Sequence, residues 1–255
     1  MSVDLNVEDG IATVTINRPD RLNAMDAAHY ALLSSAWVEV RDDPAIRVAI
    51  VTGAGDRAFS VGADLKAMPN GSLQDNWLPQ RDMLLNRGLE VYKPVIAAVN
   101  GYCLGGGLTL LMATDIRVAS TTATFGLSEV KRGVIAANGG TQRILKPLPH
   151  AIGMELLLTG DTIDAAAAAR WGLINRVVPC DQLMASAREI AARIARNAPL
   201  AVQASKELAL RSRDVDLASG LRIEQFANRL LMVSEDLDEG VRAFSEKREP
   251  AFQGK

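Results

Sequence analysis

The sequence predicts an α/β protein, with an α/β core over residues 1–180 and a helical segment over residues 181–255. Short β-branched or apolar runs alternate with stretches of helical spacing along the first range. One run, residues 94–99, is apolar almost throughout, which is typical of a strand buried on both faces. After residue 181 only amphipathic helical patterns follow, and strands interleaved with helices before helices alone indicate this organisation.

The first half of the chain alternates strands with helices. Residues 11–16 alternate and are β-branched, which predicts a strand that ends before Pro19. Asn23 or Asp26 provides the N-cap of a helix that runs to about Arg41. The remaining elements expected here are strands over residues 46–52 and 94–99 and a helix over residues 75–92.

The second half opens with three consecutive glycines, Gly105 to Gly107, which begin a short apolar helix over residues 108–113. The strands expected after it span residues 115–119, 123–125 and 173–178. Beyond residue 181 the apolar positions recur at helical spacing, which predicts three or four amphipathic helices.

Composition places the chain among ordinary globular proteins. Hydrophobic residues make up 48% and charged residues 23% of its 255 positions, which excludes a disordered chain. A net charge of -2 without a block of like charges provides no electrostatic footprint for nucleic acid. No apolar run approaches a membrane span and residues 1–6 carry no secretory pattern, so we expect neither a membrane partner nor secretion.

Cysteine and histidine usage narrows the chemistry further. Cys103 and Cys180 lie in mainly apolar stretches and make no disulfide framework, so we expect two buried, reduced thiols and a cytoplasmic location. His29 and His150 are the only histidines, which excludes most histidine-rich metal sites and leaves little material for a Ser-His-Asp triad. We therefore expect no metal and interpret both histidines as surface or packing residues.

Two glycine-containing segments are candidates for ligand binding. In residues 58–66, the small residues Gly62 and Ala63 allow a ligand to approach the backbone just before a predicted helix, where free amides favour negative charge. In residues 100–110, three glycines follow a buried strand, and their spacing matches neither a dinucleotide fingerprint nor a P-loop. Close packing and a ligand against bare backbone both remain open for this second segment.

A third segment, residues 125–133, places Glu129 among apolar residues and glycines. If this carboxylate is desolvated, its pKa rises towards the range that is useful for proton transfer. The alternative, from this segment alone, is a solvated loop glutamate.

In their order along the chain, these segments and their neighbours resemble the enoyl-CoA hydratase/isomerase (crotonase) superfamily. The matching motifs are Asn17-Arg18-Pro19, Leu22-Asn23-Ala24, Gly62-Ala63-Asp64, residues 93–101, Gly105-Gly106-Gly107, residues 139–143, Leu158-Thr159-Gly160, residues 171–179 and residues 243–248. The resemblance covers essentially the whole chain. It implies the crotonase fold of repeated ββα units with a helical C-terminal oligomerisation segment, and assembly as a homotrimer or a dimer of trimers. It also implies an acyl coenzyme A thioester as substrate, with no other cofactor.

The resemblance also implies roles for individual residues. Members of this family bind the thioester oxygen with two backbone amides, and the matching positions are Ala63 and Gly106. Fixed donors of this kind stabilise the charge that an enolate oxygen gains. The positions that the resemblance assigns to substrate and coenzyme A binding are Arg21, Leu22, Ala63, Asp64, Leu65, Lys66 and Gly106.

The carboxylates depart from the family pattern. Hydratases of this family use two glutamates, and the matching positions here are Thr109 and Glu129. A threonine hydroxyl orients water or substrate but is no carboxylate base at neutral pH. We therefore favour a lyase, and next an isomerase, with Glu129 as general acid and base, over efficient two-carboxylate hydration.

Two other functions remain open at this point. A decarboxylase or a thioester hydrolase is compatible with the same scaffold, since a fold does not decide the chemistry. The loss of one carboxylate at Thr109 is also compatible with a catalytically inactive protein that binds acyl-CoA.

Overall fold

The computed structural model describes residues 2–67 and 83–255, and its strands form two sheets. The larger sheet has the strand order β1-β2-β3-β5-β7-β10, and the smaller sheet has the order β4-β6-β8-β9. The strands of the larger sheet are β1 (Ser2–Glu8), β2 (Ile11–Asn17), β3 (Val48–Gly53), β5 (Val95–Val99), β7 (Ile116–Ser120) and β10 (Arg176–Val178). Those of the smaller sheet are β4 (Ala58–Ser60), β6 (Tyr102–Leu104), β8 (Thr124–Gly126) and β9 (Thr162–Asp164).

Successive strand pairs repeat one arrangement along the chain. In each of the pairs β3–β4, β5–β6 and β7–β8, the first strand joins the larger sheet and the second joins the smaller sheet. The corner between β5 and β6 is held by Asn100, whose side-chain amide donates to the carbonyls of Gly53 and Gly55 at 2.9 and 2.7 Å. A Cβ atom on Gly101 would overlap the carbonyl of Arg57, so this corner requires glycine. The repeated strand pairs confirm the predicted α/β fold.

Both faces of the larger sheet are covered by helices. Val95 and its alternate neighbours on β5 belong to one apolar cluster, which includes Trp37 of α1 (Ala27–Asp42). Ile96 points to the other face, where it belongs to a second cluster with Leu183 and Ile190 of α7 (Leu183–Ala195). This alternation buries β5 on both faces, as its apolar sequence predicts.

The remaining helices and turns of the described residues connect the sheets and form the C-terminal segment. The helices are α3 (Gly106–Leu111), α4 (Gly140–Arg143), α5 (His150–Thr159), α6 (Ala165–Arg170), α8 (Pro199–Arg211), α9 (Leu217–Leu231) and α10 (Glu235–Glu246). The 3-10 turns are η1 (Pro19–Arg21), η2 (Leu65–Ala67), η3 (Leu85–Arg87), η4 (Ser128–Arg132) and η5 (Cys180–Gln182).

Some elements differ from the expectation. The prediction of a helix over residues 75–92 is wrong for its described part, since residues 83–92 contain only the turn η3; residues 75–82 lie outside the described residues. Strand β1 was not predicted, although Asp9 and Gly10, at φ 51° and 74°, form the tight turn that pairs it with β2. Strands β4, β6 and β9, each of three residues, were also missed.

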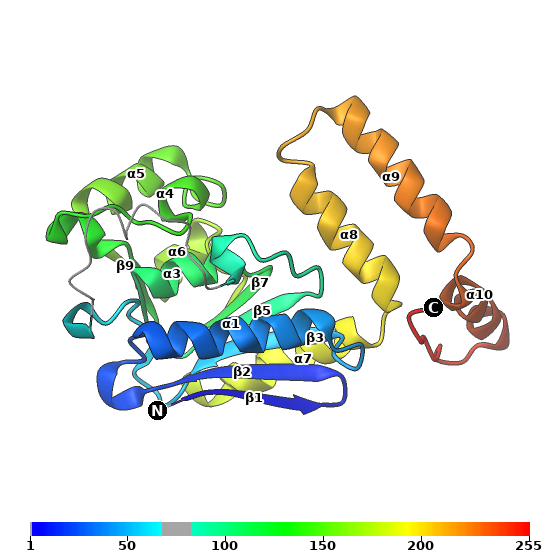
Figure 1. Cartoon of the computed structure of the whole chain (residues 1–255), viewed down its shortest axis with the longest axis horizontal. Helices are drawn as coiled ribbons and strands as arrows, with labels where there is room; N and C mark the ends of the chain where they lie inside the picture. The colour runs from blue at the N-terminus through cyan, green and yellow to red at the C-terminus, as the bar shows by residue number, and fades with distance from the viewer. Residues whose placement is uncertain (1, 68–82) are drawn as a thin grey trace.

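The C-terminal segment separates into two parts (Figure 1). Helix α7 packs against the larger sheet and so continues the core beyond residue 180. Helices α8, α9 and α10 extend away from the sheets and leave large apolar side chains exposed. The most exposed of these are Leu217 at 78%, Leu230 at 74%, Val233 at 84% and Phe244 at 87%.

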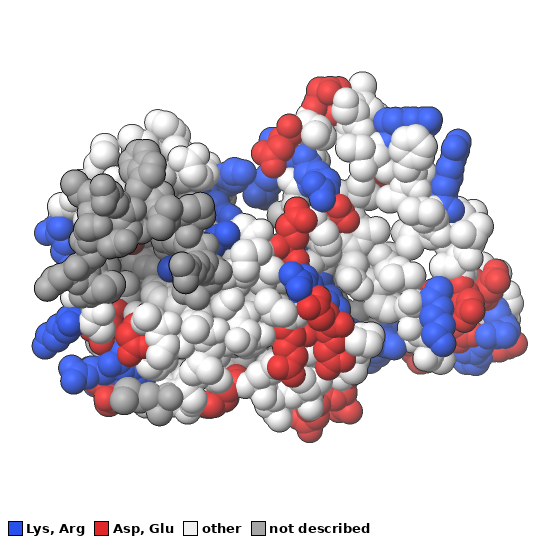
Figure 2. Space-filling view, viewed as in Figure 1, with Lys and Arg blue, Asp and Glu red and all other residues white. Residues whose placement is uncertain are grey.

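Charged side chains of both signs are interspersed over the face shown in Figure 2, most densely around α10. There Arg242 and Arg248 both form ion pairs with Glu239. No helix within residues 2–67 and 83–255 combines the length and the apolar character that crossing a membrane requires.

Candidate active site

Two backbone segments meet beside the first turn of α3. Gly62 has φ +85°, and a Cβ atom on it would overlap the amide nitrogen of Gly106 and lie 3.0 Å from the Gly106 Cα. A Cβ atom on Gly106 would in turn lie 3.6 Å from the amide nitrogen of Ala63. Because neither glycine carries a side chain, the amides of Ala63 and Gly106 lie close to each other.

Both of these amides are available to a ligand. Met25 donates to the Gly62 carbonyl at 2.8 Å and accepts from the Asp64 amide at 2.9 Å, so the Ala63 amide points away from Met25. Gly106 is the first residue of α3, where a helix leaves its N–H groups without intrahelical partners. No described residue accepts a hydrogen bond from either amide. The arrangement therefore leaves two neighbouring backbone donors, the donor pair, without an acceptor among the described residues.

A buried ion pair holds the segment that carries Ala63. The Arg18 guanidinium is 9% exposed and donates to the Asp64 carboxylate at 2.9 Å and to the Ala24 carbonyl at 3.2 Å. The same nitrogen lies 3.5 Å from Asp26. Asp64 therefore acts as a structural partner of Arg18 next to the donor pair.

Glu129 brings a carboxylate to the same place from η4. Its Oε1 atom lies 3.3 Å from the position that a Cβ atom on Gly105 would occupy. Its Oε2 atom is buried and has no hydrogen-bond partner among the described residues. Burial raises the pKa of Glu129 above its usual value of 4.5. The segment thus carries a partly desolvated carboxylate rather than the solvated loop glutamate that its sequence left open.

Thr109 is buried on α3, one turn after Gly105. Its hydroxyl donates to the Gly106 carbonyl at 3.0 Å and accepts from the side-chain amide of Asn86 at 2.9 Å. Its methyl carbon lies 3.2 Å from the position of a Cβ atom on Gly140. Thr109 is therefore part of a hydrogen-bonded network directly behind the donor pair, and its hydroxyl proton is already engaged.

The residues expected around coenzyme A lie in the early loop and in the segment that carries Ala63. Leu22 lies beside this segment, since its carbonyl accepts from the Val61 amide at 3.2 Å. Arg21, Leu65 and Lys66 are exposed. The structure thus brings the early loop and the segment after Ala63 together.

Sequence reasoning missed two residues at this site. The Tyr30 hydroxyl lies 3.4 Å from the position of a Cβ atom on Gly106, and the Arg87 guanidinium stacks 4.4 Å from the centre of the Tyr30 ring. Asn86 contacts Thr109 from η3. The one available signal for Asn86 was a polar residue directly after Leu84 and Leu85. Nothing local in the sequence indicated Tyr30.

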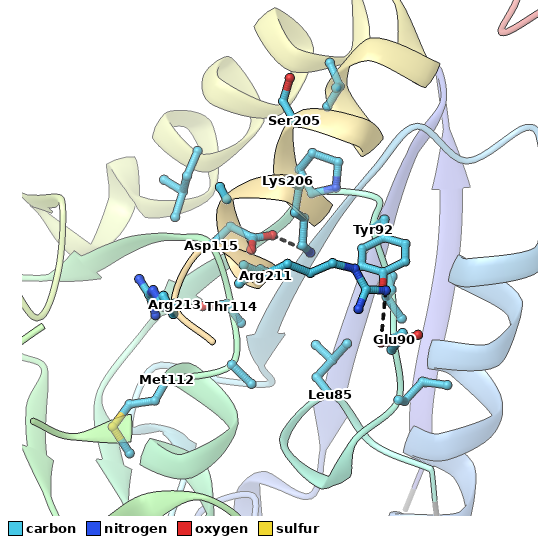
Figure 3. Close-up of a pocket in the computed structure, with 18 of the residues that line it drawn as sticks. Leu85, Glu90, Tyr92, Met112, Thr114, Asp115, Ser205, Lys206, Arg211 and Arg213 are labelled. Carbon is cyan, nitrogen blue, oxygen red and sulfur yellow. Dashed lines mark hydrogen bonds and ion pairs between the residues drawn. The ribbon is translucent and has the colours of Figure 1, made fainter. Parts of the chain in front are cut away.

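A separate groove of about 920 Å³ lies between the core and α8 (Figure 3). Residues 112–117, which follow the C-terminal end of α3, line this groove, whereas the Gly106 amide lies at the N-terminal end of that helix. Asp115 binds Lys206 there at 2.7 Å. Arg211 is paired with Glu90 on the other side of the groove. Ion pairs thus hold charged side chains on both sides of this groove.

The other singled-out residues have structural roles or none. His29 is buried and bonds to Asp26 at 2.7 Å, whereas His150 is exposed. Cys103 is a buried free thiol, but the expectation that Cys180 is buried is wrong, because it lies in the exposed turn η5 before α7. Within the described residues, no group of three His, Cys, Asp or Glu side chains is placed to hold a metal ion.

The repeated strand pairs, the paired amides and the desolvated carboxylate together define the crotonase class of α/β proteins. The enoyl-CoA hydratase/isomerase family model matches residues 6–255, and the chain belongs to that family.

Named relatives and solved structures agree with this assignment. The chain is 42% identical to (E)-benzylidenesuccinyl-CoA hydratase of Thauera aromatica over 100% of both chains. It is 41% identical to carnitinyl-CoA dehydratase of Salmonella arizonae over 99% of this chain and 98% of that one. The crystal structure of an enoyl-CoA hydratase from Bacillus anthracis matches all of both chains with a TM-score of 0.93 and 33% identity. One from Mycobacterium tuberculosis matches 100% of this chain and 99% of the other, with a TM-score of 0.92 and 36% identity.

Proposed function

We propose that this enzyme adds water to an enoyl-CoA thioester, or removes it from the corresponding hydroxyacyl-CoA, with one carboxylate. The amides of Ala63 and Gly106 bind the thioester oxygen, and Glu129 moves the proton. The observation that carries this proposal is the half-buried carboxylate of Glu129, whose buried Oε2 atom has no hydrogen-bond partner among the described residues, beside two backbone amides that no described residue accepts from. The names of two similar proteins, a hydratase and a dehydratase, support the addition or removal of water.

In the dehydration direction, Glu129 takes the proton from the α-carbon of the hydroxyacyl thioester. The electron pair of that C–H bond moves towards the carbonyl oxygen, which becomes anionic between the two amides. The enolate then forms the α,β double bond and expels the β-hydroxyl, which leaves as water with the proton returned by Glu129. Hydration is the reverse sequence, so one carboxylate carries the proton in both directions.

Two features favour this chemistry energetically. In other enzymes, removal of one fixed donor to a developing oxyanion raises the activation free energy by roughly 3–4 kcal/mol. The raised pKa of Glu129 brings the carboxyl closer to the acidity at which it both accepts and returns a proton near neutral pH.

The charged and apolar side chains near the donor pair match the phosphate and apolar groups of coenzyme A. Arg21 and Lys66 are exposed cations close to the segment that carries Ala63, and a mobile ammonium such as Lys66 meets a phosphate as a point charge. Leu22 and Leu65 add apolar surface along the same path. This coenzyme A path is part of the proposal.

An NMR assay with a panel of coenzyme A thioesters in deuterated water tests the function. We expect exchange at the α-carbon of saturated acyl-CoAs, and hydration of at least one enoyl-CoA with the hydroxyl at the β-carbon. Exchange at the γ-carbon without hydration would indicate a double-bond isomerase. Tight binding without any exchange would show that the protein binds acyl-CoA and does not catalyse.

We further infer that the protein is a homotrimer or a dimer of trimers. The exposed apolar side chains of α9 and α10 support assembly, because soluble monomers rarely leave such a surface uncovered. A cytoplasmic location is also part of the proposal, and the free thiols of Cys103 and Cys180 are compatible with it.

A further inference from the structure

Asn86 presents a second unsatisfied acceptor next to the candidate active site. The residue is 6% exposed, and its Nδ2 atom donates to the Thr109 hydroxyl at 2.9 Å. Its Oδ1 atom is buried and has no hydrogen-bond partner among residues 2–67 and 83–255. Buried side-chain oxygens without a partner are rare in native proteins, and a position for a bound water or ligand group explains such an atom.

The network around Thr109 accounts for the way this amide points. The Thr109 hydroxyl donates its one proton to the Gly106 carbonyl at 3.0 Å, so towards Asn86 it acts as an acceptor. In this arrangement the NH2 group of Asn86 faces Thr109, and its carbonyl oxygen points elsewhere.

Asn86 and Glu129 approach the same face of α3. The Thr109 amide donates to the Gly105 carbonyl at 3.0 Å, so these two residues are one helical turn apart. Glu129 contacts the Gly105 position and Asn86 binds the Thr109 side chain. Oε2 of Glu129 and Oδ1 of Asn86, two buried oxygens without partners in the described structure, thus flank one turn of the helix that carries the Gly106 amide.

We propose that Asn86 is a further catalytic residue, which binds the water that is added or the hydroxyl that is removed. This inference rests on the proposed function. In dehydration, the leaving β-hydroxyl donates its hydrogen to Asn86 Oδ1 while it accepts the proton that Glu129 returns, and the C–O bond breaks as water forms. In hydration, water donates one hydrogen to each residue, its oxygen bonds to the β-carbon, and Glu129 transfers the accepted proton to the α-carbon.

Asn86 in this role takes the place of the second carboxylate that Thr109 does not supply. A neutral acceptor holds the water as a hydrogen-bond partner but exchanges no proton. It also adds no negative charge beside Glu129, so a single ionisation governs the site. The role requires the amide oxygen of Asn86 and not merely its bulk.

The test compares hydration of crotonyl-CoA with α-proton exchange of butyryl-CoA in deuterated water. Butyryl-CoA has no β-hydroxyl, so its exchange forms and breaks no C–O bond and needs water only to replace the proton on Glu129 by deuterium. Exchange therefore reports Glu129 and the donor pair without the addition or loss of water. We expect Asn86→Ala to lower the kcat of hydration by about 10²-fold, as misplacement of a reacting group does, and to leave exchange within about threefold. An equal loss in both reactions would assign Asn86 a structural role and overturn the proposal, as would unchanged hydration.

A second variant keeps the test decisive if Asn86→Ala does not fold. Asn86→Asp places an ionisable acceptor at the water position, so we expect a second ionisation in the pH profile of hydration and a single one in that of exchange. Identical profiles for the two reactions would overturn the proposal. A wild-type chain that exchanges butyryl-CoA without hydrating crotonyl-CoA would also overturn it, whereas a chain that does neither would overturn the proposed function itself.

Discussion

Gly62 lies so close to Gly106 that a Cβ atom on Gly62 would overlap the amide nitrogen of Gly106. The two residues are 44 positions apart, and their contact brings the amides of Ala63 and Gly106 together. The positive φ of Gly62 adds a second reason for glycine, because this conformation is unfavourable for other residues. The donor pair therefore depends on the absence of a side chain at this position.

Gly62→Ala should disrupt this pair. We expect kcat to fall by about 10²–10³-fold, which is the effect of losing one oxyanion donor. Gly133→Ala is the matched control, because Gly133 has φ +76° but no atom within 4 Å of an added Cβ. The control should lower the melting temperature through backbone strain and leave kcat nearly unchanged. Equal kcat values in the two variants would contradict the assignment of the donor pair.

Glu129→Gln should lower turnover by about 10²–10⁴-fold, since a carboxamide neither accepts nor returns a proton at neutral pH. In either direction of the reaction, the ionised carboxylate first accepts a proton, and the protonated carboxyl then returns it. Because the pKa of Glu129 is raised by burial, we expect the acid limb of the wild-type pH profile of kcat/KM for dehydration to lie above pH 4.5. Unchanged turnover in the variant would remove Glu129 from the mechanism.

The same pKa shift predicts how stability depends on pH. In the folded protein the carboxyl of Glu129 holds its proton to a higher pH than the unfolded value of 4.5. Between these two pKa values the folded state binds more proton, so the free energy of unfolding falls as pH rises through the window. We therefore expect Glu129→Gln to raise the melting temperature at pH 7 relative to wild type, and to lose this advantage at pH 4. Thermal unfolding at both pH values checks this prediction.

Asp64→Asn tests the ion pair between Arg18 and Asp64, next to Ala63. The substitution removes the carboxylate that pairs with the buried Arg18 at 2.9 Å, so we expect a loss of about 1.5–3 kcal/mol in urea unfolding. Asp161→Asn is a control at an exposed pair with Lys131, and it should leave stability unchanged within error. If the two variants unfold at the same urea concentration, the pair between Arg18 and Asp64 does not hold the segment.

Leu230→Glu tests the proposed assembly. Leu230 is 74% exposed on α9, and burial against a second chain would make a charge there costly. We expect light scattering to show a smaller mass for this variant than for wild type. Leu158→Glu provides a matched control, since Leu158 is 69% exposed on α5 of the core, and it should not change the mass. A monomeric wild type would contradict the inference.

The landmarks that the sequence shares with its family located most of the candidate site. Glycines at 62 and at 105 to 107 identified where backbone comes close to backbone, because only glycine fits such positions. Glu129 was identified with them by its place among apolar residues. Asn86 and Tyr30 were not, because each acts through a contact with a residue far away in the chain. Asn86 meets Thr109 across 23 positions, and no local period encodes such a pairing.

The sequence by itself determined the buried strand over residues 94–99, the glycine positions and the replacement of one family carboxylate by Thr109. These are local properties, since backbone freedom and apolar periodicity are carried by neighbouring residues. Only the tertiary structure decided that Glu129 is partly desolvated, and that within the described part of the chain its Oε2 atom and the Oδ1 atom of Asn86, which binds Thr109, lie buried without a hydrogen-bond partner. Burial and hydrogen bonding depend on which distant segments pack around a side chain, and folding alone brings those segments together.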